Sequence, residues 1–215
     1  EYEPLKSLTG LPLDPYFSAT KMRWLLENNY AVEEASTNNN LHFSTIDSFL
    51  LFKMSGLKSF FTEPSNASRT LLMELSSCDW NDKLLKHFGL SKDQLPIIKD
   101  SFSDFGTTYG LSFLPDGIPI TCILGDQQAA LFGQAGSKQG DIKCTYGTGA
   151  FILLNTGSEI ILNDDGLLTT VAYKYNGKAF YALEGSSYIA GAAVQWLRDN
   201  LSLLDSSSMV EHLAN

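Results

Sequence analysis

Histidine and cysteine are scarce in this chain of 215 residues, which contains 3 of each. The histidines are scattered and have no metal-ligand spacing, so they predict no metal site. Cys78, Cys122 and Cys144 are far apart and include no CxxC pair. Because two of the cysteines lie inside apolar, strand-like runs, we expect buried, reduced thiols.

Basic side chains are in the minority. The chain has 15 Lys and Arg against 24 Asp and Glu, which gives a formal net charge of −9. A nucleic-acid-binding surface needs a basic stripe, so we expect no nucleic-acid partner. Nucleotides remain compatible with this charge, because backbone N–H groups can hold phosphates without a net positive charge.

Long apolar runs and a signal peptide are also missing. No apolar stretch approaches the length of a membrane span, so we expect no span and a cytoplasmic location. The content of 44% hydrophobic and 18% charged residues describes a globular protein. The chain starts at Glu1 without a methionine and stops at Asn215 inside a helix-like pattern. We therefore expect it to be a fragment of something longer.

The most informative stretch covers residues 118–151. Its apolar run 118–124 predicts a buried strand. The segment 127–134 predicts a helix, and two further strands are expected over 141–146 and 151–155.

Two features of this stretch suggest chemistry. Asp126 stands at a strand-to-helix junction, where open α/β sheets place their ligands. The turn Gly147-Thr148-Gly149 offers backbone N–H groups and one hydroxyl, which suit a phosphate chain. Together they suggest a general base facing a phosphate-binding turn. Each has a plainer alternative, because Asp126 could cap the helix and the glycine turn could be an ordinary hairpin turn.

Upstream of this stretch, apolar spacing and capping residues predict helices over 18–29, 45–54, 81–88 and 91–95. Ser18 is the expected cap of the first helix, and the polar segment 33–40 is expected to be a loop. Most apolar residues of the second helix are expected to face inward, namely Ile46, Phe49, Leu50 and Phe52.

Downstream, two β-rich runs joined at Asn176-Gly177 predict a hairpin. A helix is expected over 186–201, with Gly191 near its start and Gln195 one turn later on the same face. Small residues at such a helix start allow a flat ligand to approach closely, and they equally allow tight helix packing.

Several segments carry a specific resemblance in one order along the chain: DPYFSATK (14–21), TID (45–47), NASRT (66–70), GDQQAAL (125–131), TYGTG (145–149), NTG (155–157), GLLTT (166–170) and AGAAVQWLRD (190–199). Together they resemble the glycerol kinases within the FGGY family of carbohydrate kinases. PYFSATK and NASRT look specific to the glycerol kinases rather than to pentulose kinases. Glu63 stands where that family usually has Asp.

The resemblance implies an α/β fold of the actin-like ATPase (ribonuclease H-like) type, with parts of two domains flanking a nucleotide and substrate cleft. Residues 1–134 would form the later part of the N-terminal, substrate domain. Residues 135–215 would form the early part of the C-terminal, nucleotide domain. The family's Asp-x-Gly-Thr-Thr turn and Arg-Glu glycerol grip would lie upstream, and its glycine-rich adenine segment downstream. We therefore expect somewhat under half of such a kinase, inactive as an isolated chain.

The resemblance also implies ATP-dependent phosphorylation of glycerol to glycerol 3-phosphate, with ATP and Mg²⁺ as cofactors. Asp126 matches the catalytic base, which contacts glycerol and lies near the magnesium ion in the family. Tyr16 and Gln127 match residues that hydrogen-bond glycerol hydroxyls, and Phe151 matches an apolar contact to its carbon backbone.

On the nucleotide side, Gly147 and Thr148 match the turn that contacts the phosphates. Gly191 and Gln195 match the helix that borders the nucleotide. The implied partners are glycerol, ATP or ADP, and further copies of the chain in a dimer or tetramer. Two alternatives stay open: another FGGY kinase acting on a pentulose or polyol, and a non-catalytic member of the fold.

Two other segments imitate phosphate motifs. Residues 104–108 read Asp-Phe-Gly-Thr-Thr, but neither a kinase catalytic loop nor a hydrophobic strand precedes them. Residues 136–141 lack the spacing of a Walker loop. We expect the first segment to lie away from phosphate and the second to be a turn.

Overall fold

The computed structural model describes residues 4–214. The start of the first expected domain, residues 1–3, and the end of the second, Asn215, lie outside the described residues. The first part of the chain consists of helices and very short strands: α1 Pro4–Thr9, α2 Ser18–Asn28, α3 Tyr30–Thr37, α4 Ile46–Met54, β1 Phe61–Thr62, α5 Pro64–Ala67, β2 Met73–Glu74, β3 Asp79–Trp80, α6 Asp82–Phe88, η1 Lys92–Gln94 and β4 Ile97–Ile98. The second part carries the main sheet: α7 Asp126–Gly133, β5 Ile142–Tyr146, β6 Ala150–Gly157, β7 Leu168–Tyr175, β8 Lys178–Ser187, α8 Gly191–Asp199 and α9 Met209–Ala214.

The main sheet has 4 strands in the order β5-β6-β8-β7, and each neighbouring pair is antiparallel. The predicted hairpin is confirmed between β7 and β8. Asn176 and Gly177 both have positive φ, at 49° and 75°, which is the backbone that a tight two-residue hairpin turn requires.

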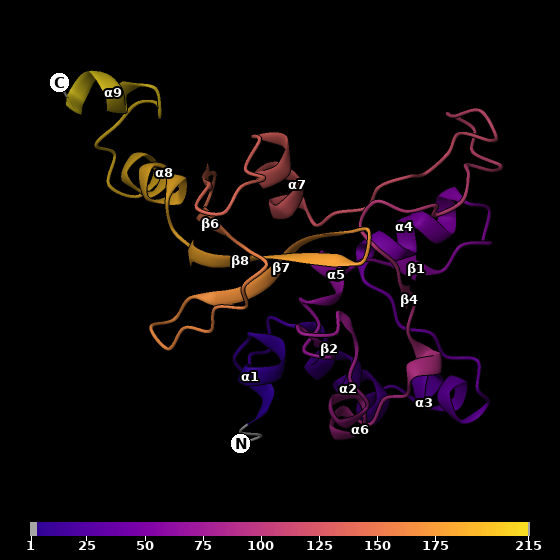
Figure 1. The fold of residues 1–215 in the computed structure, drawn as a ribbon. Helices are drawn as coiled ribbons and strands as arrows, with labels where there is room; N and C mark the ends of the chain where they lie inside the picture. Colours follow the sequence, from indigo (N-terminus) through magenta and orange to yellow (C-terminus); the bar gives the residue numbers. More distant parts are fainter. Residues whose placement is uncertain (1–3, 215) are drawn as a thin grey trace.

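Both faces of this sheet are covered. Val171 and Tyr181 pack into the main hydrophobic core with the helical part of the chain, whereas Ala172 and Ala182 pack with Leu131 of α7. Neighbouring residues of a strand point to opposite faces, so the sheet separates two cores. Figure 1 shows α7 on one side of the sheet and α5 and β2 on the other. One face of the sheet therefore packs against the helical part of the chain, and the other face packs against α7.

The ends of the sheet differ in their surroundings. Helices α8 and α9 extend away from the remainder of the molecule, and neither contains a buried residue (Figure 1).

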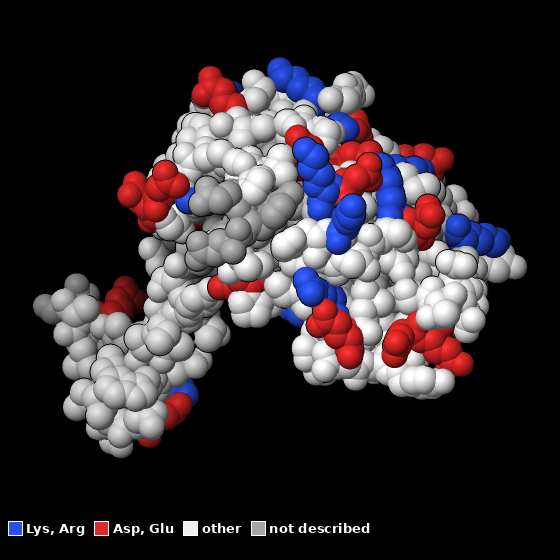
Figure 2. Space-filling view, turned by 90° about the horizontal axis from the view of Figure 1, so that it is seen from below, with Lys and Arg blue, Asp and Glu red and all other residues white. Residues whose placement is uncertain are grey.

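On the face drawn in Figure 2, Lys and Arg side chains lie among Asp and Glu side chains rather than in a stripe of one sign.

The prediction of a buried strand over 118–124 is wrong. This segment is extended and exchanges backbone hydrogen bonds with residues 101–106, including Ile120 N to Gly106 O at 2.8 Å. Only isolated bridges form, and no strand of the described chain pairs with its other edge. Cys122 is consequently exposed, contrary to the expectation of a buried thiol, whereas Cys78 is buried and Cys144 is half-buried.

Two predictions in the helical part are also wrong. Much of the expected loop over 33–40 belongs to helix α3, because the Asn29 side chain caps it by accepting the N–H groups of Ala31 and Val32. Ser18 is the first residue of α2 rather than its cap, and Phe17 holds the cap position.

Helix α4 faces differently from the prediction, because its apolar residues surround the helix. Ile46 and Leu50 are 68% and 50% exposed, and Phe49 is exposed as well. Only Ser48 and Leu51 are buried. Ile46 and Leu50 line the cleft described below instead of the core.

The predicted helix over 186–201 starts too early. Strand β8 continues to Ser187, and helix α8 begins only at Gly191. The other predicted helices are confirmed within a few residues, and the segment 136–141 is a turn closed by the hydrogen bond from Asp141 N to Lys138 O at 3.0 Å.

Candidate active site

A cleft of about 820 Å³ lies between the two parts of the chain. It brings together four of the predicted site residues, namely Tyr16, Asp126, Gln127 and Phe151. Tyr16 precedes α2 and is 58% exposed, Asp126 and Gln127 begin α7, and Phe151 lies on β6. Segments far apart in the sequence therefore converge on one cavity.

Asp126 presents an exposed carboxylate to this cleft. Gly125 occupies the helix cap position with extended backbone, φ −60° and ψ 150°, and Asp126 is the first helical residue. One carboxylate oxygen, Oδ1, accepts the N–H of Gln127 at 2.8 Å. The alternative that Asp126 is the helix cap is thus wrong, and its exposed carboxylate is accessible to a ligand in the cleft.

A buried polar network supports the residue before Asp126. The Gly125 N–H donates to Ser65 Oγ at 2.8 Å, and that hydroxyl donates to the Glu63 carboxylate. Glu63 is fully buried, and it also accepts Asn66 N at 2.7 Å and Ser101 Oγ at 2.6 Å. Burial raises the pKa of Glu63 above its ordinary value, although these hydrogen bonds oppose the rise. The resemblance flagged Glu63 only as a departure, and its network was not predicted.

Lys143 on β5 is a second residue that the sequence reasoning missed. It is 2% exposed, and its ammonium donates to Gln127 Oε1 and, at 2.8 Å, to Thr145 Oγ1. Burial lowers the pKa of Lys143, while the negative charges of Asp126 and Glu184 oppose that shift. A lysine between Ile142 and Cys144, in the middle of a predicted strand, was the available signal.

Two residues that line the cleft form an ion pair. Arg69 of the NASRT segment pairs with Glu184 of β8 at 2.9 Å, and both side chains are largely buried. The Arg69 guanidinium also lies over the Phe17 ring, 5.4 Å from its centroid. This pair ties the α5 region to the sheet next to the cleft.

The predicted nucleotide-binding residues gather at another place. The turn between β5 and β6 contacts the start of α8, since Gly191 N donates to Gly147 O at 2.9 Å and Ala192 N donates to Thr148 O at 3.1 Å. Gly147 N–H is itself engaged with Gly149 O at 2.8 Å, so it is not the free donor that the turn's composition suggested. The turn is a hairpin turn, as the plainer alternative held, and it also holds a helix end.

Gly191 is required by packing. A Cβ atom at this position would lie 2.6 Å from Gly147 O, closer than real Cβ contacts permit. Gly191 and Gln195 line a separate cavity of about 620 Å³ between α8 and α9. Gly147, Thr148 and Gly191 are therefore in mutual contact, while Gln195 faces this neighbouring space.

Residues 104–108 lie outside the cleft. Asp104 Oδ1 accepts the N–H of Gly106 at 2.9 Å, which forms a local turn, and Phe105 is fully buried. Neither Asp104 nor Gly106 lines the cavity that contains Asp126.

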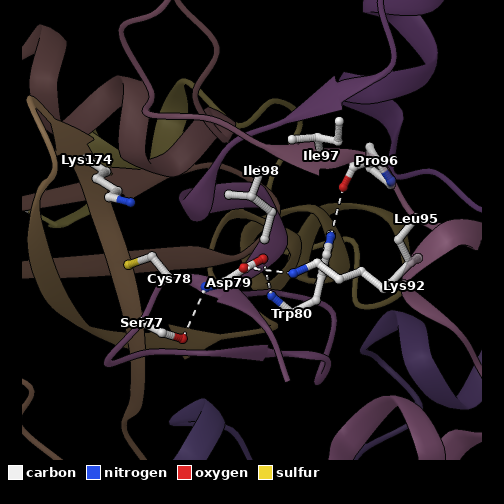
Figure 3. A pocket seen from close by; sticks show the side chains of 10 residues that line it. All are labelled: Ser77, Cys78, Asp79, Trp80, Lys92, Leu95, Pro96, Ile97, Ile98 and Lys174. Atoms are coloured by element: carbon white, nitrogen blue, oxygen red, sulfur yellow. Dashed lines mark hydrogen bonds and ion pairs between the residues drawn. The ribbon is translucent and has the colours of Figure 1, made fainter. Parts of the chain in front are cut away.

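A further cavity of about 260 Å³ lies beside β3 and β4 and contains none of the predicted residues (Figure 3). Its charged groups pair with protein partners, since Lys92 binds Asp79 at 2.8 Å and Lys174 binds Asp100 at 3.4 Å. The Trp80 indole donates to Pro96 O at 2.8 Å. The Trp80 contact links β3 to the residue before β4, and the charged side chains that line this cavity are engaged with protein partners.

Among residues 4–214, no cluster of three His, Cys, Asp or Glu side chains could hold a metal ion alone. Within the same residues, no helix is long and apolar enough to cross a membrane.

Comparison with known proteins assigns this arrangement to a class. The α/β fold is that of the actin-like ATPases, in which parts of two domains flank a cleft. Residues 1–133 match the N-terminal domain of the FGGY family of carbohydrate kinases, and residues 142–215 match its C-terminal domain. The chain belongs to the FGGY family of carbohydrate kinases.

Within that family, the chain is similar to proteins named glycerol kinase. It is 54% identical to the glycerol kinase of Bdellovibrio bacteriovorus, over 96% of this chain and 42% of that protein. It is 46% identical to the glycerol kinase of Staphylococcus epidermidis, over 99% of this chain and 43% of that protein. The chain thus spans less than half the length of these relatives.

Solved structures agree with this similarity. The crystal structure of Plasmodium falciparum glycerol kinase with ADP superimposes with a TM-score of 0.89 at 39% identity, over 97% of this chain and 42% of that one. A xylulose kinase from Rhodospirillum rubrum reaches 0.80 at 17% identity, over 99% of this chain and 42% of that one, which supports the fold alone.

Proposed function

We propose that the protein containing this chain transfers the γ-phosphoryl group of ATP to the 3-hydroxyl of glycerol. The observation that carries the proposal is the cleft in which an exposed carboxylate, Asp126, lies with Tyr16, Gln127 and Phe151. The acceptor is inferred from relatives named glycerol kinase that are 46% to 54% identical to the chain.

In this mechanism Asp126 accepts the proton of the attacking hydroxyl. The hydroxyl oxygen forms a bond to the γ-phosphorus in line as the bond to the departing ADP oxygen breaks. The start of α7 suits this role, because Gly125 is fixed by Ser65 while the Asp126 carboxylate stays exposed. Tyr16 and Gln127 hold the glycerol hydroxyls, and Phe151 contacts its carbons.

The nucleotide is proposed to bind along the β5–β6 turn and the start of α8. Gly147 and Thr148 border its phosphates, and Gly191 and Gln195 border the nucleoside side of the site. The contact of the turn with α8 supports this assignment, because one ligand could then touch both elements. The ADP named with the Plasmodium falciparum structure supports a nucleotide cofactor.

Magnesium fits this site in the mode that it prefers with nucleotides. Mg²⁺ keeps several waters and binds one or two carboxylates together with substrate phosphates, so a cage of protein ligands is not needed. Asp126 is the residue that would hold it, with the phosphates of ATP. When bound, the ion neutralises charge on the transferred phosphoryl group.

An acceptor competition tests the proposal. Protein expressed from its complete reading frame is supplied with ATP, Mg²⁺ and equal concentrations of glycerol and a ketopentose. We expect glycerol 3-phosphate as the main product. Phosphorylation of the ketopentose alone would establish a different FGGY kinase, and turnover of neither would favour a non-catalytic member of the fold.

We further propose that this protein works in the cytoplasm as a homo-oligomer, either a dimer or a tetramer. Sedimentation equilibrium of the protein from the complete reading frame measures the assembly directly. A monomer at all concentrations tested would reject the oligomer.

A further inference from the structure

Lys143 is a buried, charged residue beside the cleft to which the proposed mechanism assigns no role. Lys143 is almost fully buried on β5, and its ammonium contacts Gln127 Oε1 and Thr145 Oγ1. Gln127 lines the cleft next to Asp126, whereas Lys143 is not among the lining residues. Lys143 therefore contacts a residue that is proposed to bind glycerol, but it does not line the space where glycerol would bind.

The contact decides how the Gln127 amide is turned. An ammonium group has three donors and no acceptor, so only the oxygen end of an amide can face it. With Oε1 held by Lys143, the Nε2 end and its two N–H donors are the part of the amide left for other partners. Without this contact, the two ends of the amide are nearly equal in shape and can exchange places.

We propose that Lys143 is a positioning residue that orients the Gln127 amide, so that Gln127 donates a hydrogen bond to a glycerol hydroxyl oxygen. This inference rests on the proposed function, because it takes Gln127 to be a glycerol ligand. It adds a direction to that contact: glycerol accepts from Gln127, and its own proton remains available to Asp126 or Tyr16.

The polar neighbours of Lys143 stabilise its charged, protonated form. A buried ammonium is costly unless it is paired and hydrogen-bonded. Here two side-chain oxygens accept from it, and the negative charges of Asp126 and Glu184 favour its protonated form. A side chain that only filled space between β5 and α7 would need no charge, so an apolar replacement separates the two roles.

The experiment uses protein expressed from its complete reading frame. Lys143→Met keeps an unbranched side chain without donors, and Lys143→Arg keeps the charge and the donors. Lys174→Met is the matched control, because Lys174 is also largely buried but pairs with Asp100 at 3.4 Å away from the cleft. Glycerol binding is measured by titration calorimetry, and the KM values for glycerol and ATP by steady-state kinetics.

We expect Lys143→Met to weaken glycerol binding and raise its KM about tenfold, the effect of losing one well-oriented hydrogen bond. The KM for ATP should change by less than about twofold, because the nucleotide residues lie elsewhere. Lys143→Arg should recover part of the loss, and Lys174→Met should match the wild type. An unchanged glycerol KM in Lys143→Met would overturn the inference.

A double-mutant cycle with Gln127→Ala tests whether Lys143 acts through the amide. Once Gln127 is gone, Lys143→Met should add almost nothing to the glycerol KM. If the two substitutions raise the glycerol KM by factors that multiply in the double variant, Lys143 acts independently of Gln127 and the inference is rejected. If Lys143→Met does not fold, Thr145→Val loosens the same ammonium, and an unchanged glycerol KM there would count against the proposal equally.

The wild type in this series separates the two claims. A wild-type protein that does not bind glycerol contradicts the proposed function. The cycle is then run with the acceptor that the protein does phosphorylate. If the effects of the Lys143 and Gln127 substitutions on the KM for that acceptor are coupled, the positioning role is supported. If the two effects are independent, the positioning role is rejected.

Discussion

Ser65 and Gly125 are 60 residues apart in the sequence, and the Ser65 hydroxyl oxygen accepts the Gly125 N–H at 2.8 Å. The same hydroxyl donates a hydrogen bond to the buried Glu63 carboxylate. Because Gly125 immediately precedes Asp126, the backbone position of the proposed base depends on a polar network in the NASRT region.

Ser65→Ala should damage both stability and turnover. The change leaves the Gly125 N–H and one Glu63 oxygen without this partner, so we expect the free energy of unfolding to fall by about 1–3 kcal/mol. Movement of the Asp126 backbone should lower kcat about tenfold or more. Urea denaturation and steady-state kinetics measure the two effects.

Ser48→Ala is the matched control. Ser48 is fully buried in α4, and its hydroxyl has no hydrogen-bond partner among the described residues. Its replacement should cost no stability, because alanine is the better helix former. Equal losses in Ser48→Ala and Ser65→Ala would argue against a specific role for the Ser65 network.

Glu63 should give the stability of the protein a distinct pH dependence. Burial raises its pKa above the ordinary value of 4.5. The folded protein therefore keeps this proton at pH values where the unfolded chain has released it. The stabilising contribution is full below the ordinary value and is lost as the pH rises through the folded-state pKa.

Comparison with Glu63→Gln isolates this contribution, because glutamine does not titrate. We expect the stability of the wild type relative to Glu63→Gln to decline as the pH rises from acidic to neutral values, because burial raises the pKa of Glu63 in the folded protein. Urea midpoints across this range measure the difference. A relative stability that increases with pH would mean that the folded-state pKa lies below the ordinary value.

Gly191→Ala should separate α8 from the β5–β6 turn. The added Cβ would lie 2.6 Å from Gly147 O, which is backbone and cannot rotate away. We expect a destabilisation of about 1–3 kcal/mol and a KM for ATP that rises more than the KM for glycerol. Calorimetric unfolding and kinetics of the protein from the complete reading frame provide both readings.

Gly133→Ala is the corresponding control on α7. A Cβ there meets no atom within 4 Å, and Gly133 is not among the positive-φ glycines. The substitution should therefore be neutral or stabilise the protein by up to about 1 kcal/mol. A larger loss in Gly133→Ala than in Gly191→Ala would contradict the packing argument.

Local signals explain the parts of the fold that could be predicted. Helix α6 begins after Asn81, whose side chain accepts two backbone N–H groups, and it ends at Gly89 with φ 73°. The Asn176-Gly177 turn likewise fixes its hairpin by its own backbone preference. These elements depend on residues adjacent in the sequence.

The remaining errors come from tertiary contacts that no local pattern encodes. The apolar run 118–124 resembles a buried strand, but it pairs along one edge only and leaves Cys122 exposed. Ile46 and Leu50 have the composition of core residues and instead line the cleft.

The candidate site divides in the same way. The family resemblance identified Asp126, Gln127, Tyr16 and Phe151, which the structure brings to one cleft. It gave no sign that Lys143 contacts Gln127, because that hydrogen bond joins α7 to β5 across 16 positions of the chain.

The central claim is that Asp126 is the general base, and the most direct measurement is kcat for glycerol phosphorylation in Asp126→Asn. Asp104→Asn serves as the control, because Asp104 is an exposed carboxylate outside the cleft that caps a local turn. We predict a loss of about a thousandfold or more in Asp126→Asn, and near wild-type turnover in Asp104→Asn. Turnover that survives in Asp126→Asn would contradict the assignment and leave Asp126 as the first residue of a helix.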